Sequence, residues 1–171
     1  MMFHMVQLFV GRGLSETDAA GAFTTIAISM STARFVGGVL ADRLPLNFLL
    51  SSSMVGMAWS AVILISISDF WSGHTFASVM GVSFGLAMAV SMTVWVRYYG
   101  RAHLGKIQGS LTTVGVAASS LGPFLMGSAY DLFGGYDEVL WVFAWLAAAS
   151  ATAGLLATPP KAHGSVPKET L

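Results

Sequence analysis

One charged residue inside an apolar stretch is the best candidate in this sequence for binding a small anion. Arg34 is the only charged residue between Asp18 and Asp42. Its planar guanidinium can hold a carboxylate through two parallel hydrogen bonds. If this stretch crosses a membrane, an arginine there costs at least about 2.5–3.5 kcal/mol to insert, so it should face a wet cavity or a partner. We predict an anion-binding role, with a structural ion pair to an acid outside this chain as the alternative.

Two further pairs of polar residues are spaced one helical turn apart and could line a cavity. His4 and Gln7 form the first pair. Because histidine titrates near neutral pH, His4 could serve proton-linked transport, or it could simply be solvated. Gln108 and Thr112 form the second pair, although threonine also bonds to its own helix backbone. We predict these four side chains, with Arg34, as substrate-binding residues.

The sequence holds no pattern typical of an enzyme. It has no cysteine, no pair of histidines or acids with metal-ligand spacing, and no glycine-rich phosphate loop. We therefore predict no catalytic residue, no metal site and no cofactor. An ATP-driven pump or a membrane hydrolase has no support within this chain.

The composition is that of a membrane protein. Of 171 residues, eight are basic and eight acidic, so only 9% are charged, while 55% are hydrophobic. A soluble domain has about 25% charged residues, so this chain cannot cover a water-exposed surface. The net charge of zero gives no attraction to polyanions, which argues against a nucleic-acid partner.

The charges are separated by uncharged stretches long enough to cross a bilayer. Arg43 and Asp69 are 25 uncharged residues apart, and 27 more separate Asp69 from Arg97. A helix needs roughly 20 residues to span the hydrocarbon core. We predict an all-α integral membrane protein with a helical bundle over residues 1–157. Its five full spans lie near 19–40, 47–67, 74–95, 107–129 and 139–157, and Met1–Val10 is too short to cross.

The loop charges predict the orientation of the bundle in the membrane. If the spans alternate, six basic residues lie on one side and only Arg12 on the other. Basic loops stay in the cytoplasm, so we place the C-terminus there. The tail 158–171, with Pro159-Pro160, is predicted to be disordered. The six basic residues are Arg43, Arg97, Arg101, Lys106, Lys161 and Lys168.

Small residues and prolines mark positions where helices could meet or bend. Gly38 lies near the end of a span, and Asp42-Arg43 follows in a short loop. These charges could pair with neighbouring helices as a latch, or they could be solvated loop charges. Gly122-Pro123 should break or bend its helix, because proline lacks the backbone donor. Gly81-xxx-Gly85 offers a face for close helix contact.

Three stretches of the sequence carry recognisable motifs: Gly38-xxx-Asp42-Arg43, Tyr98-Tyr-Gly-Arg-Ala-His-Leu-Gly105-Lys-Ile-Gln-Gly109 and Leu121-Gly-Pro123-xxx-Gly127-xxx-Asp131-xx-Gly134. With them the sequence resembles the C-terminal half of the major facilitator superfamily of secondary transporters. The first stretch is similar to the superfamily's cytoplasmic loop motif between helices eight and nine, although Leu44-Pro45-Leu46 stands where a glycine and basic residues often follow. The second is similar to the loop before helix eleven, and the third to the end of that helix.

The resemblance implies that Met1–Val10 is the end of helix seven and that the five spans are helices eight to twelve. This six-helix bundle would belong to a 12-helix transporter and pair with an N-terminal half, with the substrate site between the halves. Within the superfamily, the sequence resembles the monocarboxylate and oxalate–formate branches. Arg34 matches their helix-eight arginine, whereas Met30 stands where some members carry an aspartate.

The predicted function is transport of a small organic anion by alternating access. A single intramembrane cation favours a monocarboxylate, accompanied by a coupled proton or an exchanged anion. The expected partners are the lipid bilayer and either the N-terminal half or a second copy of this chain. One alternative is a non-transporting membrane scaffold or sensor subunit, and another is a half-transporter that dimerises.

Overall fold

The computed structural model describes residues 4–100 and 104–157, and all its elements are helices. The predicted disordered tail lies outside the described residues. The helices are α1 (Met5–Gly11), α2 (Glu16–Arg43), α3 (Leu46–Ile65), α4 (Phe70–Tyr99), α5 (Leu104–Phe133) and α6 (Asp137–Leu156).

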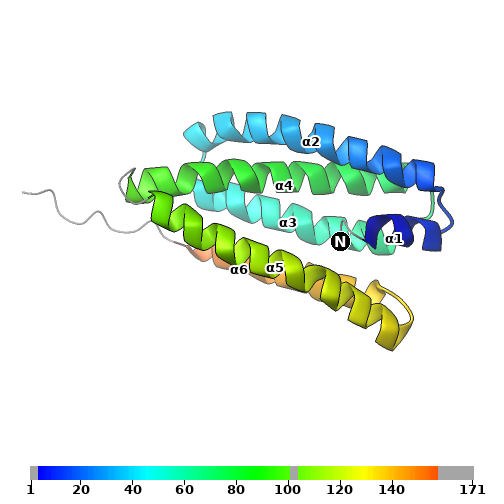
Figure 1. The fold of residues 1–171 in the computed structure, drawn as a ribbon. Helices are drawn as coiled ribbons and strands as arrows, with labels where there is room; N and C mark the ends of the chain where they lie inside the picture. Colours follow the sequence, from blue (N-terminus) through cyan, green and yellow to red (C-terminus); the bar gives the residue numbers. More distant parts are fainter. Residues whose placement is uncertain (1–3, 101–103, 158–171) are drawn as a thin grey trace, which may run out of the picture.

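The five long helices run back and forth, so their connections gather at two ends of the molecule (Figure 1). One end, called here the capped end, carries the α1–α2, α3–α4 and α5–α6 connections. The other, called here the basic end, carries the α2–α3 and α4–α5 connections. Helix α2 packs mainly on α4, and α3 packs on both α4 and α6. Successive connections thus lie at alternate ends of the molecule, as the assignment of the loop charges to two sides assumed.

Two helices begin at the capped end with side chains that bond to their own free backbone groups. Ser15 accepts from the backbone N–H of Asp18, whose carboxylate accepts from Ser15 N–H in return. Asp69 and Ser72 make the same reciprocal cap at the start of α4. The hydrogen bonds from Ser72 hold the pKa of Asp69 below its ordinary value, since they favour the charged carboxylate. These acids therefore have a local structural role.

Four helices are both long and apolar enough to cross a membrane: α2, α3, α4 and α6. They contain or overlap four of the five predicted spans. The remaining predicted span, 107–129, lies inside α5, which has 30 residues but is not among the four. Its glycines, serines and threonines dilute its apolar character. The all-helical membrane class is confirmed for the described residues, while the count of five spans stays a prediction.

Large apolar side chains cover the outside of the molecule. Phe35, Trp59, Phe124 and Leu132 are all exposed. A soluble monomer rarely shows so much apolar surface. The buried residues instead form a cluster toward the capped end, which includes Phe9, and a smaller one toward the basic end, which includes Leu49. This outward-apolar pattern fits a protein surrounded by lipid.

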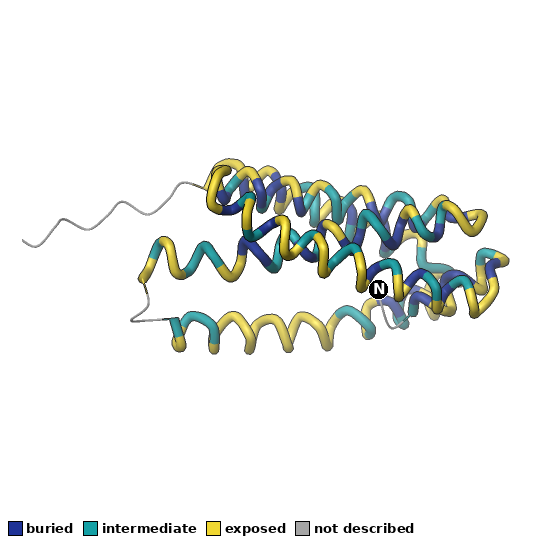
Figure 2. Tube along the Cα trace, turned by 90° about the horizontal axis from the view of Figure 1, so that it is seen from above, coloured by how far each residue is buried: buried dark blue, intermediate teal, exposed yellow. Residues whose placement is uncertain are grey.

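Helix α5 stands apart from the rest of the bundle over much of its length. Every residue from 109 to 121 is exposed, and Figure 2 shows the helix as a separate, largely exposed segment. Its buried residues are Met126 and Ala129, near the capped end. The described residues therefore leave most of α5 uncovered.

Glycines bring α2 and α4 into very close contact. A Cβ added at Gly81 would lie 2.7 Å from the carbonyl oxygen of Ile26, and one at Gly85 would lie 2.3 Å from that of Met30. At Gly37, on α2, it would lie 3.0 Å from the Cβ of Ala89. Real Cβ atoms essentially never come within 3.0 Å of another atom, so alanine at either α4 glycine would force the helices apart. The predicted small-residue face at Gly81-xxx-Gly85 thus meets α2.

Candidate functional site

Arg34 lies within α2 and its side chain is exposed. Among the described residues, no acidic side chain forms an ion pair with it. Its backbone nitrogen would lie 3.0 Å from a Cβ at Gly85, so the backbone at Arg34 packs directly against α4. The structure therefore fixes the backbone of this residue and leaves its guanidinium free on the surface of the chain. That arrangement suits a group that binds something outside these helices.

His4 and Gln7 lie together at the capped end, where they share a third residue. His4 Nδ1 is 3.1 Å from Gln7 Oε1, and the Tyr136 hydroxyl donates to the same oxygen at 3.2 Å. The rings of His4 and Tyr136 have centroids 5.7 Å apart. Burial raises the pKa of Tyr136 above its ordinary value, with the charges of Tyr130 and Asp131 adding to the effect, so its hydroxyl keeps the proton that it donates.

These residues line a cavity of about 560 Å³ between α1 and the α5–α6 connection. Arg12, Tyr130 and Asp131 also line it. The wall is mixed in charge and hydrogen-bonding character, and it faces the capped end. Sequence spacing predicted that His4 and Gln7 share a face, but it did not predict that Tyr136 of the α5–α6 connection lies against that face.

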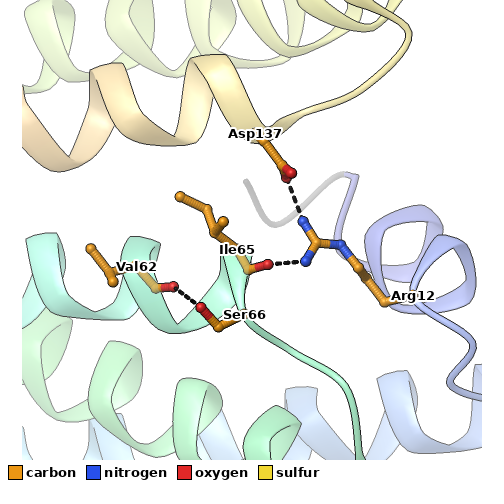
Figure 3. A network of polar contacts seen from close by, with 5 residues as sticks. All are labelled: Arg12, Val62, Ile65, Ser66 and Asp137. Carbon is orange, nitrogen blue, oxygen red and sulfur yellow. Dashed lines mark hydrogen bonds and ion pairs between the residues drawn. The ribbon is translucent and has the colours of Figure 1, made fainter.

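Arg12 ties three segments together beside this cavity (Figure 3). Its guanidinium donates to the backbone oxygen of Ile65, at the end of α3, and to the carboxylate of Asp137, at the start of α6. The contact with Asp137 is also an ion pair. We call this set the Arg12 clamp. It joins Arg12, in the α1–α2 connection, to Ile65 and Asp137, which lie 53 and 125 positions further along the chain.

At the basic end, Asp42 pairs with a cation on another helix. Arg97, in the last turn of α4, lies 3.5 Å from its carboxylate. Both side chains are exposed, which makes this a surface pair of modest strength. Arg43 is exposed and forms no ion pair among the described residues. A Cβ at Gly38 would meet nothing within 4 Å, so Gly37, rather than Gly38, makes the close helix contact.

The candidate residues on α5 lie away from those on α2. Gln108 is half-buried and Thr112 exposed, and neither side chain forms a hydrogen bond within the described part of the chain. Of the break or bend predicted at Gly122-Pro123, the break does not occur, because α5 continues from Leu104 to Phe133 through the proline, while the bend stays a prediction. Pro123 removes only the one backbone hydrogen bond that would reach Ser119, and the turns on both sides keep the helix intact.

The contact between His74 and α2 was not predicted from the sequence. His74 lies half-buried between helices, with Nδ1 2.8 Å from Thr25 Oγ1 of α2. Tyr136 and the Arg12 clamp were also not predicted. Their contacts join residues 49 to 132 positions apart, and no local spacing in a sequence encodes such distances.

The sequence of this chain matches a known protein family. Residues 2–171 match the profile of the Major Facilitator Superfamily. The chain is 30% identical over 125 residues to a probable nitrate/nitrite transporter, NarK2, of Mycobacterium tuberculosis strain CDC 1551 / Oshkosh, and equally to the protein of that name in strain ATCC 25618 / H37Rv. The match covers 70% of this chain and 30% of each relative. No solved structure matches it.

The chain therefore belongs to the Major Facilitator Superfamily, as its motifs indicated. Members of this family are membrane transporters rather than enzymes. The relatives named above transport nitrate or nitrite according to their names, so they give no support to the monocarboxylate branch predicted from the motifs.

Proposed function

We propose that this chain supplies one side of the path by which a secondary transporter moves a small monovalent anion, and that Arg34 binds the anion. The observation that carries the proposal is Arg34 itself. It is the only charge inside a predicted span, and its exposed guanidinium stands on a helix backbone fixed against α4. An unpaired charge at such a depth is expensive, so it marks a functional position.

The guanidinium limits the substrate to a class. Nitrate, nitrite and carboxylates each offer two oxygens in one plane, which two parallel N–H donors of an arginine can bind. The named relatives favour nitrate or nitrite. The second candidate is a small monocarboxylate, which the motifs favoured and which the same geometry fits. A proton or an exchanged anion would accompany the substrate.

Transport requires a second bundle facing this one. The chain spans 30% of the length of the relatives it matches, and residues 109–121 of α5 are exposed throughout. An N-terminal half or a second copy of the chain would cover this surface and could enclose a cavity together with Arg34. Rocking of the two bundles would then open the cavity alternately to the two sides, as in other secondary transporters.

The two ion pairs lie at opposite ends of the bundle and suit such a motion. Asp42 and Arg97 join α2 to α4 at the basic end, and the Arg12 clamp joins three segments at the capped end. The exposed pair of Asp42 and Arg97 is weak enough to break and re-form during a conformational cycle. We infer that Asp42, held by Arg97, is the latch of the basic end, with Gly38 and Arg43 beside it but outside the ion pair.

Uptake by the full-length protein in liposomes tests the role of Arg34. We compare nitrate, nitrite, formate and acetate in the unchanged protein and in Arg34→Lys and Arg34→Gln. Both variants should lose substrate affinity at least tenfold, because lysine keeps the charge but cannot form the two-pronged contact. Lys106→Gln, at an exposed cation on α5, is the matched control and should transport normally.

Preserved affinity in Arg34→Lys would contradict the bidentate contact. Preserved affinity in both variants would remove Arg34 from the binding site altogether. The order of affinities in the unchanged protein decides between the two candidate classes of substrate.

A further inference from the structure

A histidine lies between α2 and α4 near the capped end. The His74 ring contacts Phe70, with centroids 4.2 Å apart, and Nδ1 lies 2.8 Å from Thr25 Oγ1. A Cβ added at Gly21 would lie 3.4 Å from His74 Cε1 and 3.6 Å from Nε2. The imidazole thus packs edge-on against the backbone of α2, at a position where that helix has no side chain.

The hydrogen bonds of Thr25 assign the proton on the neutral imidazole. The Thr25 hydroxyl donates to the backbone oxygen of Gly21 at 3.2 Å, which uses its single hydrogen. With that hydrogen directed at Gly21, Thr25 Oγ1 accepts from His74, and Nδ1 carries the proton. In neutral imidazole the other nitrogen, Nε2, is then the acceptor.

That second nitrogen is buried and has no hydrogen-bond partner among the described residues. A proton added to Nε2 would create a buried donor that has no acceptor where the ring now lies. The charged residues at this end of the two helices are Glu16 and Asp18 on α2 and Asp69 at the start of α4. All three are acids. The pKa of Asp18 is lowered mainly by its hydrogen bonds with Ser15, and a charge on His74 lowers it further. A protonated ring thus has a reason to leave its place and an anion to move toward.

We propose that His74 is a proton-binding site that controls the α2–α4 contact. In the neutral form the ring docks against Gly21 and donates to Thr25. On protonation the ring leaves this position for the side of Asp18, and α2 separates from α4 at the capped end. The ligand is a proton, and the responding element is the helix that also carries Arg34.

The chain offers a clean way to measure this separation because it contains no cysteine. Spin labels are attached to cysteines at Ala20 on α2 and Thr75 on α4, both exposed. Any native cysteine elsewhere in the full-length protein is replaced by serine first. The distance between the labels is then measured in nanodiscs at pH 8 and at pH 5, on either side of the range in which histidine titrates.

The unchanged protein should give a longer or broader distance distribution at pH 5 than at pH 8. His74→Gln keeps a donor for Thr25 but cannot titrate, so it should show the pH 8 distribution at both values. His4→Gln removes the other described histidine of this end and should keep the response. An unchanged distribution in the parent protein, or a response that survives His74→Gln, would overturn the proposal.

A second variant tests the same site if His74→Gln does not fold. Thr25→Val removes the acceptor that stabilises the docked ring, so the longer distances should already be populated at pH 8. A pH 8 distribution equal to that of the parent protein would contradict the assignment. Because these measurements follow distances and not uptake, they stand apart from the anion-binding role of Arg34.

Discussion

Single residues in this protein act mainly by connecting segments that lie far apart in the chain. Asp42 is the simplest case, because its partner Arg97 is 55 positions away and both side chains remain exposed. Such a pair contributes about 0–1 kcal/mol to stability, whatever its role in a conformational cycle. Its effect on stability and its effect on conformation can therefore be separated.

We predict that Asp42→Asn leaves the thermal unfolding temperature nearly unchanged but shifts the population of states open at the basic end. The carboxylate no longer holds Arg97, so the contact between α2 and α4 there is weaker. The measurement is the labelling rate of single cysteines at the two ends of the full-length protein. Arg43→Gln removes a neighbouring charge that has no ion pair among the described residues, and should leave both rates as they were. Equal rates in Asp42→Asn would contradict the latch.

Helices α2 and α4 form the tightest contact between elements. The spacing of charges predicts both helices, since it marks where apolar segments end. The spacing of Gly81 and Gly85 predicts a face for close helix contact. The helix that those glycines face cannot be predicted from the sequence, because it depends on the rotation of α4 about its axis. The same missing rotation hid the contact between Thr25 and His74.

The close contact between α2 and α4 predicts that one added methyl group strongly lowers the stability of the protein. Gly85→Ala should destabilise the protein by about 1–3 kcal/mol, the usual effect of overpacking, because the new Cβ meets the backbone oxygen of Met30. Thermal unfolding of the purified protein in detergent measures this. Gly38→Ala is the control, since nothing lies within 4 Å of the added atom and alanine favours a helix. Equal stability of the two variants would show that α2 and α4 can separate freely.

At the scale of the whole molecule, the sequence predicted the helical class and the division of the loops between two ends. It could not predict that α5 would stand apart, because the spacing of charges says where a helix lies and nothing about which neighbours cover it. For Arg34 it supplied the residue and its chemistry. The surroundings of that arginine depend on surfaces outside this chain, so the sequence could not predict the cavity that would hold the substrate.

The loop charges predict the orientation of the whole bundle. In intact cells, a membrane-impermeant maleimide should label a cysteine at Ser68, in the α3–α4 connection at the capped end. It should label one at Leu44, in the α2–α3 connection, only after the cells are permeabilised. Both residues are exposed, so access differs only by side of the membrane. The opposite labelling pattern would place the basic end outside and overturn the cytoplasmic C-terminus.

The reciprocal caps at Ser15 and Asp69 have a consequence for how the helices can move. A helix normally starts with backbone N–H groups that seek acceptors in water or on a neighbour. In α2 and α4 some of these N–H groups bond to side chains of the same turn, so each helix is capped by its own residues. Either helix can then slide or tilt at the membrane surface without leaving those donors unpaired. The capped end can therefore change its arrangement while both helices remain intact.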